Sequence, residues 1–469
     1  MTSNRSEPPS RFGLREGTEV SRAAREPQRG ESASAVVRTT ALSEPSETLM
    51  EQIVASRNMQ RAWQNVNANR GAPGPDGITL EEFEATFAAH WPSVRQHLLE
   101  GTYEPAPARR KSIPKPDGTE RHLGIPNVQD RVIQQAILQV LTPIFDPSFS
   151  ESSFGFRPQR SAHGAALQVQ RHIRDGYREC VDMDLSKFFD RVQHDVLLVR
   201  VARKVRDKRL LRLIGRYLRA GVMVDAQLQP SHEGTMQGGP LSPLLANILL
   251  DDFDKELEHR GLRFVRYADD FLVFTKTKAA AARVFVSVER YLTRKLKLVV
   301  NRQKSRTCST AGVEFLGFVF EGYGGQIRVS PKNVMKFKDR VREITRRNRG
   351  VSLSQRYQEL RRYFQGWVGY FGLVPIKSFF SELDKWVRRR LRSCYWKQWR
   401  YPRTRITQLR QLGIKLDEAV THGISSKGPW VMSSSQAVHQ ALSLEFFAQS
   451  GLTSLFTLWS QLAPKFRTA

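Results

Sequence analysis

The sequence predicts an α+β domain followed by a strongly basic helical region. Between residues 49 and 330, strand-like and helix-like stretches mix without strict alternation, which favours an α+β arrangement. One strand-like run, FVRYADDFLVF (264–274), contains the adjacent acids Asp269 and Asp270. After Pro331 the composition changes, and residues 331–410 hold 22 Lys and Arg against 5 Asp and Glu. These three observations predict the fold class and its two parts.

The overall charge indicates a polyanionic partner. The formal charge is +28 with an isoelectric point near 10.4, which favours nucleic acid. No apolar run reaches the ~18–20 residues of a membrane span, and residues 1–20 lack the apolar centre of a signal peptide. Cys180, Cys308 and Cys394 are far apart without a CxxC motif. This spacing argues against a zinc ribbon or a disulfide framework and favours a reducing cytoplasm, so no membrane partner and a cytoplasmic location are expected.

Four regions are expected along the chain. Residues 1–48 lack hydrophobic periodicity and predict a disordered tail, whereas residues 49–330 form the α+β part. Residues 331–410 form the basic helical region, and residues 411–469 a small C-terminal tail domain. Within the α+β part, helices are expected at 49–69, 78–100, 130–141, 193–220 and 279–297, with a loop entering a helix over 152–173 and a Gly/Pro turn running into a helix over 234–257. Strands are expected at 111–126 (two, around Asp117-Gly118), 180–185, 264–274 (a hairpin) and 313–320.

The paired acids predict a metal site at a hairpin tip. A tight turn at Ala268–Asp270 would present both carboxylates, anchored behind by apolar strands. Adjacent carboxylates are tolerated when a divalent cation lies between them, and Mg²⁺ prefers hard oxygen ligands. VDMDL (181–185) offers a third acid in a similar apolar context, which would complete a two-metal site. The alternative for two adjacent aspartates is a solvated turn or a helix cap. The segment DDFDKE (251–256) is interpreted as the surface of a helix.

Eight sequence blocks, in order, resemble those of reverse transcriptases. They cover residues 71–320 and read GAPGPDGIT, IPKPDGTERHLGIP, SSFGFRPQRSAHGAA, VDMDLSKFFDRVQHDVL, GTMQGGPLSPLLANILLDDFDKEL, RFVRYADDFLVF, NRQKSR and VEFLGF. The chain is most similar to the reverse transcriptase–maturases encoded by bacterial group II introns. This resemblance implies a right-hand polymerase, with fingers and palm containing the YADD hairpin, followed by an α-helical thumb and maturase domain.

The resemblance also implies catalytic roles. Asp184, Asp269 and Asp270 would hold two Mg²⁺ ions, with Mn²⁺ as the alternative, for in-line displacement at the α-phosphate. Asp182 competes with Asp184, but the M-D-L context favours Asp184, and Asp182 is expected on the opposite strand face. Nucleotide-binding roles would fall on four residues: Lys115 and Arg121 on the triphosphate, Phe189 beneath the sugar against a 2′-hydroxyl, and Gln237 on the incoming nucleotide. Lys304 is a further candidate for contacting phosphate.

The basic helical region predicts RNA binding. Arg alternates with aromatic residues in RRYFQGWVGYFGL (361–373) and DKWVRRRLRSCYWKQWRYPRTR (384–405). A solvated amphipathic helix is the alternative. The candidate RNA-binding residues are Arg361, Arg362, Arg388, Arg389, Arg390, Arg392, Lys397 and Arg400. The resemblance implies that this region binds the intron RNA and assists its splicing.

The implied function is RNA-directed DNA synthesis with a splicing-assisting role that supports retrohoming. Its partners would be intron RNA, a DNA primer or target, and dNTPs, while homodimerisation stays open. An HNH endonuclease is not expected, because no Cys follows Cys394 and the histidines His422 and His439 are isolated. The short tail and KGPW (427–430) resemble the class C lineage. The alternatives are a splicing-only maturase, and a reverse transcriptase recruited to phage defence or to a CRISPR system.

Overall fold

The computed structural model describes residues 48–114, 118, 120–224, 227–229, 231 and 233–467. The chain divides into two compact units. Within the described part, the first unit comprises residues 48–149, 187–252 and 294–299, and the second comprises 150–186, 253–293 and 300–467. The expected nucleotide-binding residue Lys115 and the expected tail 1–48, except for Thr48, lie outside the described residues.

The helices of the first unit pack around apolar faces. α2 packs on α4, and its buried residues Met59, Ala62, Trp63 and Val66 recur at helical spacing. α3 begins with a capping box between Thr79 and Glu82. The helices are α1 (Leu49–Ile53), α2 (Ser56–Ala68), α3 (Leu80–Glu100), α4 (Val128–Phe145), α6 (His194–Val201) and α7 (Lys208–Arg219), with single 3₁₀ turns η1 (Asp146–Ser148) and η2 (Phe188–Asp190).

The sheet of the first unit has the strand order β2-β1-β4-β5. Its strands are β1 (Ala108–Pro114), β2 (Glu120–Ile125), β4 (Val222–Val224) and β5 (Gln227–Gln229). β1 and β2 are antiparallel, with Arg110 opposite Gly124 and Pro114 opposite Glu120. The expected pair of strands within 111–126 is therefore confirmed.

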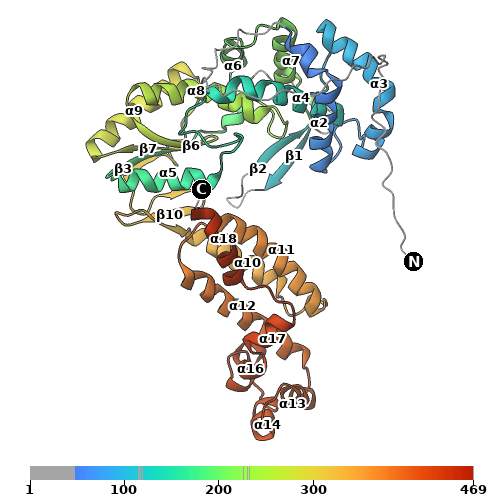
Figure 1. The fold of residues 1–469 in the computed structure, drawn as a ribbon, viewed down its shortest axis with the longest axis vertical. Coiled ribbons are helices and arrows are strands. Elements are labelled where there is room, and N and C mark those ends of the chain that lie inside the picture. Colours follow the sequence, from blue (N-terminus) through green and yellow to red (C-terminus); the bar gives the residue numbers. More distant parts are fainter. Residues whose placement is uncertain are drawn as a thin grey trace, which may run out of the picture. The chain divides into compact units, whose positions relative to one another are not determined.

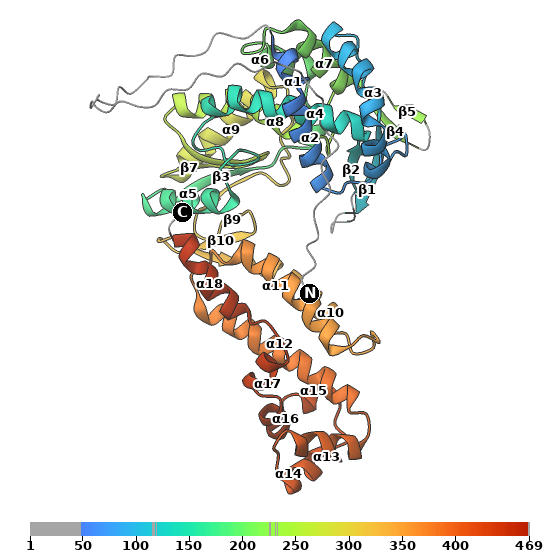
Figure 2. The same cartoon turned by 45° about the vertical axis from the view of Figure 1, so that its right-hand side comes forward.

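The second unit contains an antiparallel sheet with the order β6-β7-β3-β8. Its strands are β3 (Glu179–Met183), β6 (Arg263–Tyr267), β7 (Asp270–Thr275) and β8 (Arg306–Ser309). Helix α5 (Ala162–Arg174) runs along one face of this sheet and buries Ala165, Val169 and Ile173 (Figures 1 and 2). α8 (Ser242–His259) and α9 (Lys278–Lys295) follow the chain across the boundary of the two units.

The expected single strand over 313–320 is wrong. The chain forms two short antiparallel strands there, β9 (Glu314–Phe315) and β10 (Phe318–Glu321), and β11 (Gln326–Val329) adds a third. Leu316 and Gly317 make the turn with φ angles of 51° and 79°. Two consecutive positive φ values match the twist of a hairpin, and Gly supplies one of them without strain. The apolar run hides this turn, because Leu316 is an unusual residue for the left-handed region.

The expected helical region after Pro331 is confirmed. Its helices are α10 (Pro331–Ile344), α11 (Leu353–Phe371), α12 (Lys377–Gln398), α13 (Pro402–Gln411), α14 (Leu416–Gly423), α15 (Pro429–Met432), α16 (Gln436–Ala441), α17 (Leu444–Gln449) and α18 (Leu455–Arg467). α18 packs along α11 and α12 (Figure 1). Asp384 of α12 accepts hydrogen bonds from the backbone N–H groups of Leu455 and Phe456, which caps the start of α18.

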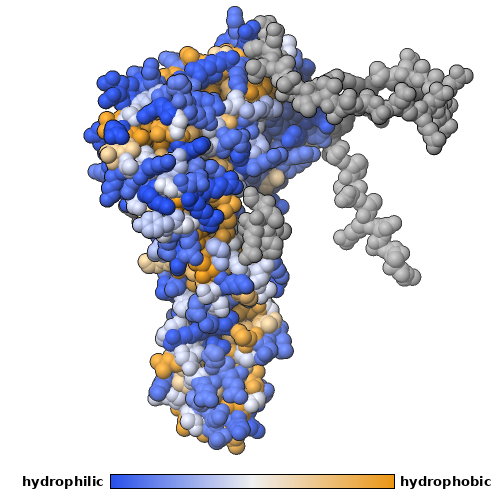
Figure 3. All heavy atoms as spheres, turned by 60° about the vertical axis from the view of Figure 1, so that its left-hand side comes forward, coloured by the Kyte–Doolittle hydropathy of each residue, from blue (hydrophilic) through white to orange (hydrophobic). Residues whose placement is uncertain are grey.

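The surface is largely hydrophilic on the face drawn in Figure 3, with apolar residues in small groups. Among the described residues, no helix combines the length and the apolar character that a membrane crossing requires.

Candidate active site

The YADD residues form the tip of the β6–β7 hairpin. Tyr267 pairs with Asp270, so Ala268 and Asp269 make a two-residue turn and Asp270 begins β7. The expected tight turn is confirmed. Ala268 has a positive φ of 59°, which is uncommon for a residue other than glycine and must be held by its surroundings.

A buried ion pair supports this turn. The side chains of Arg266 and Asp254 are both completely inaccessible to solvent. Arg266 Nε donates to Asp254 Oδ1 (2.8 Å) and Arg266 Nη2 to Asp254 Oδ2 (2.5 Å), while Arg266 Nη1 donates to the carbonyl of Ala268 (3.0 Å). The interpretation of DDFDKE as a helix surface is therefore wrong for Asp254. Asp254 lies on the apolar stripe of α8 with Leu250, Phe253 and Leu257, and that stripe is the sequence signal for its burial.

The SSFGF segment packs against the same hairpin. The N–H of Phe154 donates to the carbonyl of Arg266, and the N–H of Arg266 donates to the carbonyl of Ser152, both at 2.9 Å. Gly155 lies so close to the backbone of Ala268 that no Cβ would fit there. The hairpin tip is thus fixed by two sets of contacts. The Arg266 side chain binds the Ala268 carbonyl, and residues 152–155 pack against the backbone of Arg266 and Ala268.

Asp184 lies immediately after β3 and is held by the loop 300–305. Asn301 donates to it twice, from Nδ2 to Asp184 Oδ2 (3.1 Å) and from its backbone N–H to the Asp184 carbonyl (2.8 Å). The N–H of Asp184 donates to Ser305 Oγ (3.0 Å). Sequence reasoning missed Asn301 and Ser305, although both flank Lys304 in the NRQKSR block.

The strand register brings Asp184 next to the YADD turn. Met183 of β3 pairs with Phe271 of β7, so the next step along the two strands leads to Asp184 and Asp270. Desolvation by the surrounding protein, followed by the charges of Asp269, Asp184 and Asp182, raises the pKa of Asp270 to about 6. The Asp270 side chain is nevertheless exposed, so we attribute the larger part of this rise to carboxylate repulsion.

The expectation that Asp182 faces away from Asp184 is wrong. Residues two positions apart on a strand share a face, and Asp182 adds to the negative charge at Asp270. The carboxylate of Asp182 pairs instead with Arg306 of β8 (Oδ2 to Nε, 3.5 Å). Burial raises the pKa of Asp182, and Arg306 opposes this rise. Asp182 therefore already has a cationic partner.

The donor chemistry of Asp184, Asp269 and Asp270 fits Mg²⁺. All the side-chain donors are carboxylate oxygens, and the repulsion at Asp270 is the kind that a divalent cation relieves. In the described part of the chain, no three His, Cys, Asp or Glu side chains already converge as a ligand set. Lys304 is exposed, and its charge lowers the pKa of Asp270 slightly against the carboxylates.

The expected nucleotide-binding residues that the structure describes lie in the first unit. Arg121 Nε donates to Gln237 Oε1 (2.9 Å), and the N–H of Gly124 donates to the Gln237 carbonyl (2.7 Å). Gly238 has a φ of 123°, and a Cβ there would meet the carbonyl oxygen of Gly124 at 2.5 Å. Two of the expected residues, Arg121 of β2 and Gln237 of the loop before α8, are thus in direct contact, and glycine is required at position 238, where this loop approaches β2.

Phe189 is buried in the turn η2, which the 234–237 loop holds in place. The N–H of Thr235 donates to the Phe189 carbonyl (2.6 Å), and the N–H of Gly234 donates to the Val192 carbonyl (2.7 Å). The buried imidazole of His194 donates from Nε2 to the Gly234 carbonyl (2.8 Å). His194 is a residue that sequence reasoning missed.

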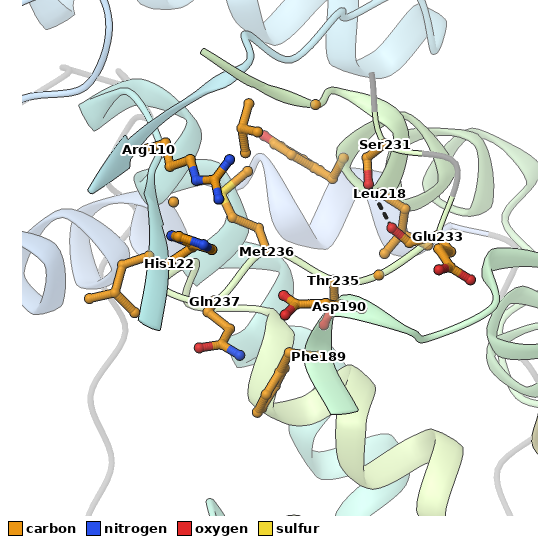
Figure 4. Close-up of a pocket in the computed structure, with 16 residues that line it drawn as sticks. Arg110, His122, Phe189, Asp190, Leu218, Ser231, Glu233, Thr235, Met236 and Gln237 are labelled. Atoms are coloured by element: carbon orange, nitrogen blue, oxygen red, sulfur yellow. Dashed lines mark hydrogen bonds between the residues drawn. The ribbon is translucent and has the colours of Figure 1, made fainter. Parts of the chain in front are cut away.

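A cavity of about 240 Å³ lies beside Phe189 and Gln237. Figure 4 shows these two side chains extending to the same side, whereas Arg110 and His122 approach from β1 and β2. Phe189, the residue expected to exclude a 2′-hydroxyl, and the loop that carries Gln237 therefore line the same cavity within this unit.

The eight basic candidates of the helical region differ in exposure. Arg392 is only 3% exposed, and its Nε and Nη2 both donate to the Leu442 carbonyl. Arg390 is half-buried and donates to Thr345 and to the Arg342 carbonyl, and Arg389 lies over the Trp430 ring. Four residues of the set are exposed: Arg361, Arg362, Lys397 and Arg400, of which Arg361 donates to Thr453 Oγ1. Arg388 is half-buried, and burial lowers its pKa.

Comparisons with known proteins agree with this architecture. A family model described as reverse transcriptase (RNA-dependent DNA polymerase) matches residues 113–320, and one described as the group II intron maturase-specific domain matches residues 334–413. Protein YkfC of Escherichia coli strain K12 is 31% identical over 359 residues, which are 67% of this chain and 93% of YkfC.

Two further proteins are similar to this chain over a smaller share of their own length than YkfC is. Group II intron-encoded protein LtrA of Lactococcus lactis subsp. cremoris is 29% identical over 350 residues, which are 61% of this chain and 57% of LtrA. A chain of a solved structure described as a partial Cas6-RT-Cas1–Cas2 complex is 27% identical, with 54% of this chain and 44% of that chain covered and a TM-score of 0.35. The two family models, in this order along one chain, together with the similarity to LtrA, show that the chain belongs to the bacterial-type reverse transcriptase–maturases encoded by group II introns.

Proposed function

We propose that the chain is an RNA-directed DNA polymerase whose helical region binds its group II intron RNA, assists the splicing of that RNA and thereby supports retrohoming. The observation that carries the polymerase role is the register of β3 and β7, which leads to Asp184 directly after β3 and to Asp270 at the start of β7. The observation that carries the RNA role is the excess of positive charge in residues 331–410, several of whose basic side chains are exposed.

Asp184, Asp269 and Asp270 would hold two Mg²⁺ ions. When bound, these ions supply charge neutralisation at the reacting phosphate and raise the acidity of the primer hydroxyl. Asn301 keeps one oxygen of Asp184 oriented, and Arg266 fixes the turn that carries Asp269. The chain's contribution at this position is to place three carboxylates before the substrate arrives.

The reaction joins a nucleotide to a primer. The primer 3′-hydroxyl loses its proton to solvent and its oxygen forms a bond to the α-phosphorus, while the bond between that phosphorus and the bridging oxygen breaks and pyrophosphate leaves with the electron pair. Arg121 and Lys115 would bind the triphosphate oxygens through charge-assisted hydrogen bonds. Gln237 would contact the incoming nucleotide, and the ring of Phe189 would exclude a 2′-hydroxyl, so dNTPs are preferred.

RNA binding would use the exposed basic residues of α11, α12 and the segment after it. Arg362, Lys397 and Arg400 are exposed and can contact phosphates directly. Arg390 and Arg392 contribute to the packing of the helices, so their removal would act through structure. No catalytic residue is needed for this role, because the protein only has to stabilise folded RNA.

The test is primer extension on poly(rA)/oligo(dT) with dTTP and Mg²⁺, comparing wild type with the Asp269→Ala/Asp270→Ala variant. The proposal predicts synthesis by the wild type and none by a variant that still binds intron RNA. Absence of synthesis by folded wild-type protein would reject the polymerase role. A splicing assay on the intron RNA then tests the maturase role separately, since the variant is expected to retain it.

A further inference from the structure

Two cysteines face each other across the sheet that carries the acids. Cys180 of β3 pairs in register with Cys308 of β8, and their sulfur atoms are 3.5 Å apart. Cys180 is fully buried, whereas Cys308 is half-buried at the edge strand. Buried cysteines commonly act as small apolar residues. This pair differs because the two sulfur atoms contact each other and one of the residues can be reached from solvent.

The backbone geometry is compatible with a disulfide. Directly opposed residues of antiparallel strands have Cα atoms about 4.5–5.5 Å apart, within the range of about 4.4–6.8 Å that disulfides occupy. The third cysteine, Cys394, lies on α12, where its thiol donates to the Thr345 carbonyl (3.2 Å). Cys394 has no neighbouring cysteine, so its reactivity can be compared with that of Cys180 and Cys308 in the same protein.

We propose that Cys180 and Cys308 are a reversible oxidation site, in which a peroxide converts the dithiol to a disulfide and thereby slows DNA synthesis. The Cys308 sulfur attacks one oxygen of hydrogen peroxide, which gives a sulfenic acid and, after proton uptake, water. The Cys180 sulfur then displaces hydroxide from that sulfenic acid, and the hydroxide leaves as water with the Cys180 proton. In total, two thiols lose two electrons and two protons, and one peroxide becomes two waters.

The order of these steps follows from the surroundings of the pair. A hydrogen bond from the Cys180 thiol lowers the pKa of Cys308, and the thiolate is the reactive form. The same contact and burial raise the pKa of Cys180. Cys308 is thus the more accessible and the more acidic thiol, and Cys180 is the resolving one.

The site is connected to the acids through two neighbouring contacts. Cys180 and Asp182 lie two residues apart on β3 and so share one face, and Asp184 follows directly after the strand. On β8, Arg306 pairs with Asp182, and the adjacent Ser305 accepts a hydrogen bond from the N–H of Asp184. Closing the sulfur–sulfur distance from 3.5 Å to a bond of about 2.05 Å draws the two strands together two residues from the Asp182–Arg306 contact and three to four residues from the Asp184–Ser305 contact. Asp184 is then displaced from its position.

The disulfide is expected to be readily reduced. Facing residues of a sheet have Cβ atoms about 4.5–5.5 Å apart, whereas relaxed disulfides prefer about 3.8 Å. Strained disulfides are the labile and regulatory ones. The oxidised form is therefore expected to return to the dithiol with a simple thiol reductant.

The experiment treats the full chain with hydrogen peroxide and follows both the cross-link and activity. Mass spectrometry of peptides is expected to show a Cys180–Cys308 disulfide, with Cys394 still alkylated as a free thiol. Primer extension is expected to fall about 10–100-fold and to recover with dithiothreitol. The matched controls are Cys308→Ser, which should keep its activity in peroxide, and Cys394→Ser, which should respond like wild type.

Two results would overturn the proposal. One is oxidation of Cys308 to sulfinic acid without a link to Cys180. The other is a loss of activity that does not depend on the link, seen either as a link that leaves primer extension unchanged or as an equal loss in the Cys308→Ser variant. If Cys308→Ser does not fold, Cys308→Ala replaces it. The peptide analysis does not rest on the proposed polymerase function, so a failure of that function leaves the cross-link result interpretable.

Discussion

Arg266 and Asp254 form a completely buried ion pair directly behind the turn that presents Asp269. Removing one partner of such a pair leaves an uncompensated buried charge, which typically costs about 3–5 kcal/mol. We therefore expect Asp254→Asn to lower the free energy of unfolding by about this amount, measured by urea denaturation. Glu258→Gln, an exposed change on the same helix, is the control and should cost clearly less.

Replacing both Asp254 and Arg266 distinguishes the effect of the ion pair on stability from its effect on the position of the turn. An Asp254→Leu/Arg266→Met variant removes both charges, and buried ion pairs can be replaced by apolar residues at little cost in stability. The Ala268 carbonyl loses its donor in this variant. We expect a folded protein whose primer extension is about 10–100-fold slower. Wild-type rates in this double variant would show that Arg266 does not position the turn.

Asn301 is expected to orient Asp184. Asn301→Ala removes the hydrogen bond to Asp184 Oδ2 and keeps the backbone contact, so the fold should persist. We expect primer extension to slow by about tenfold or more, with a raised Mg²⁺ requirement. Gln303→Ala, an exposed change in the same loop, is the control. An unchanged Mg²⁺ requirement in Asn301→Ala would contradict the orienting role.

Sugar selection is expected to depend on Phe189 and on the loop that holds it. Phe189→Val should raise the relative use of rNTPs by about 10–200-fold, because the ring no longer fills the space of a 2′-hydroxyl. Gly234→Ala places a Cβ about 3.0 Å from the carbonyl oxygens of Phe189 and Asp190, at a φ of 96°. It should shift the same dNTP-to-rNTP ratio of kcat/KM. A change of kcat/KM by the same factor for both sugars would indicate only a general loss of structure.

His172 is expected to reduce stability in acid. Burial, with a contribution from Arg263, lowers the pKa of His172 to about 4, against about 6.5 for an unfolded histidine. Between these values the unfolded chain binds a proton that the folded chain does not, so stability falls as the pH drops from about 6.5 to 4. The loss from this one group is about 3 kcal/mol. His172→Gln should remove this part of the pH dependence in urea denaturation measured at pH 7 and pH 4.5.

The salt dependence of RNA binding should distinguish surface from packing arginines. Each lost phosphate contact to single-stranded RNA should reduce the slope of log K against log salt by about 0.7. We expect this for Arg362→Gln, Lys397→Gln and Arg400→Gln, all at exposed positions. Arg392→Gln should instead lower the free energy of unfolding, since Arg392 holds the Leu442 carbonyl. A reduced slope with unchanged stability in Arg392→Gln would contradict this division.

The sequence predicts the parts of this site that local patterns encode. The hairpin at 264–274 follows from apolar strands around two acids, and the helical region after Pro331 follows from its periodicity and charge. The roles of Arg266, Asn301 and His194 depend on partners 12, 117 and 40 residues away, and such pairings leave no local pattern. Arg392 illustrates the same limit, because its charge suggests a surface role while its guanidinium is buried.

The strand face on which Asp182 lies is predictable from the sequence, and the expectation that it is opposite to Asp184 is wrong. A period of two puts Asp182 and Asp184 on one face, and only the pairing of Asp182 with Arg306 separates their roles. The short hairpin at 314–321 was hidden for a different reason, since Leu316 occupies a left-handed turn position inside an apolar run.

The most direct measurement compares Asp184→Asn with Asp182→Asn in primer extension across a Mg²⁺ titration. If Asp184, Asp269 and Asp270 form the metal-binding set, Asp184→Asn should lose about 100-fold or more in rate at every Mg²⁺ concentration. Asp182→Asn should stay within about tenfold of wild type, because Asp182 pairs with Arg306. The reverse result, an active Asp184→Asn variant beside an inactive and folded Asp182→Asn variant, would contradict the proposed ligand set.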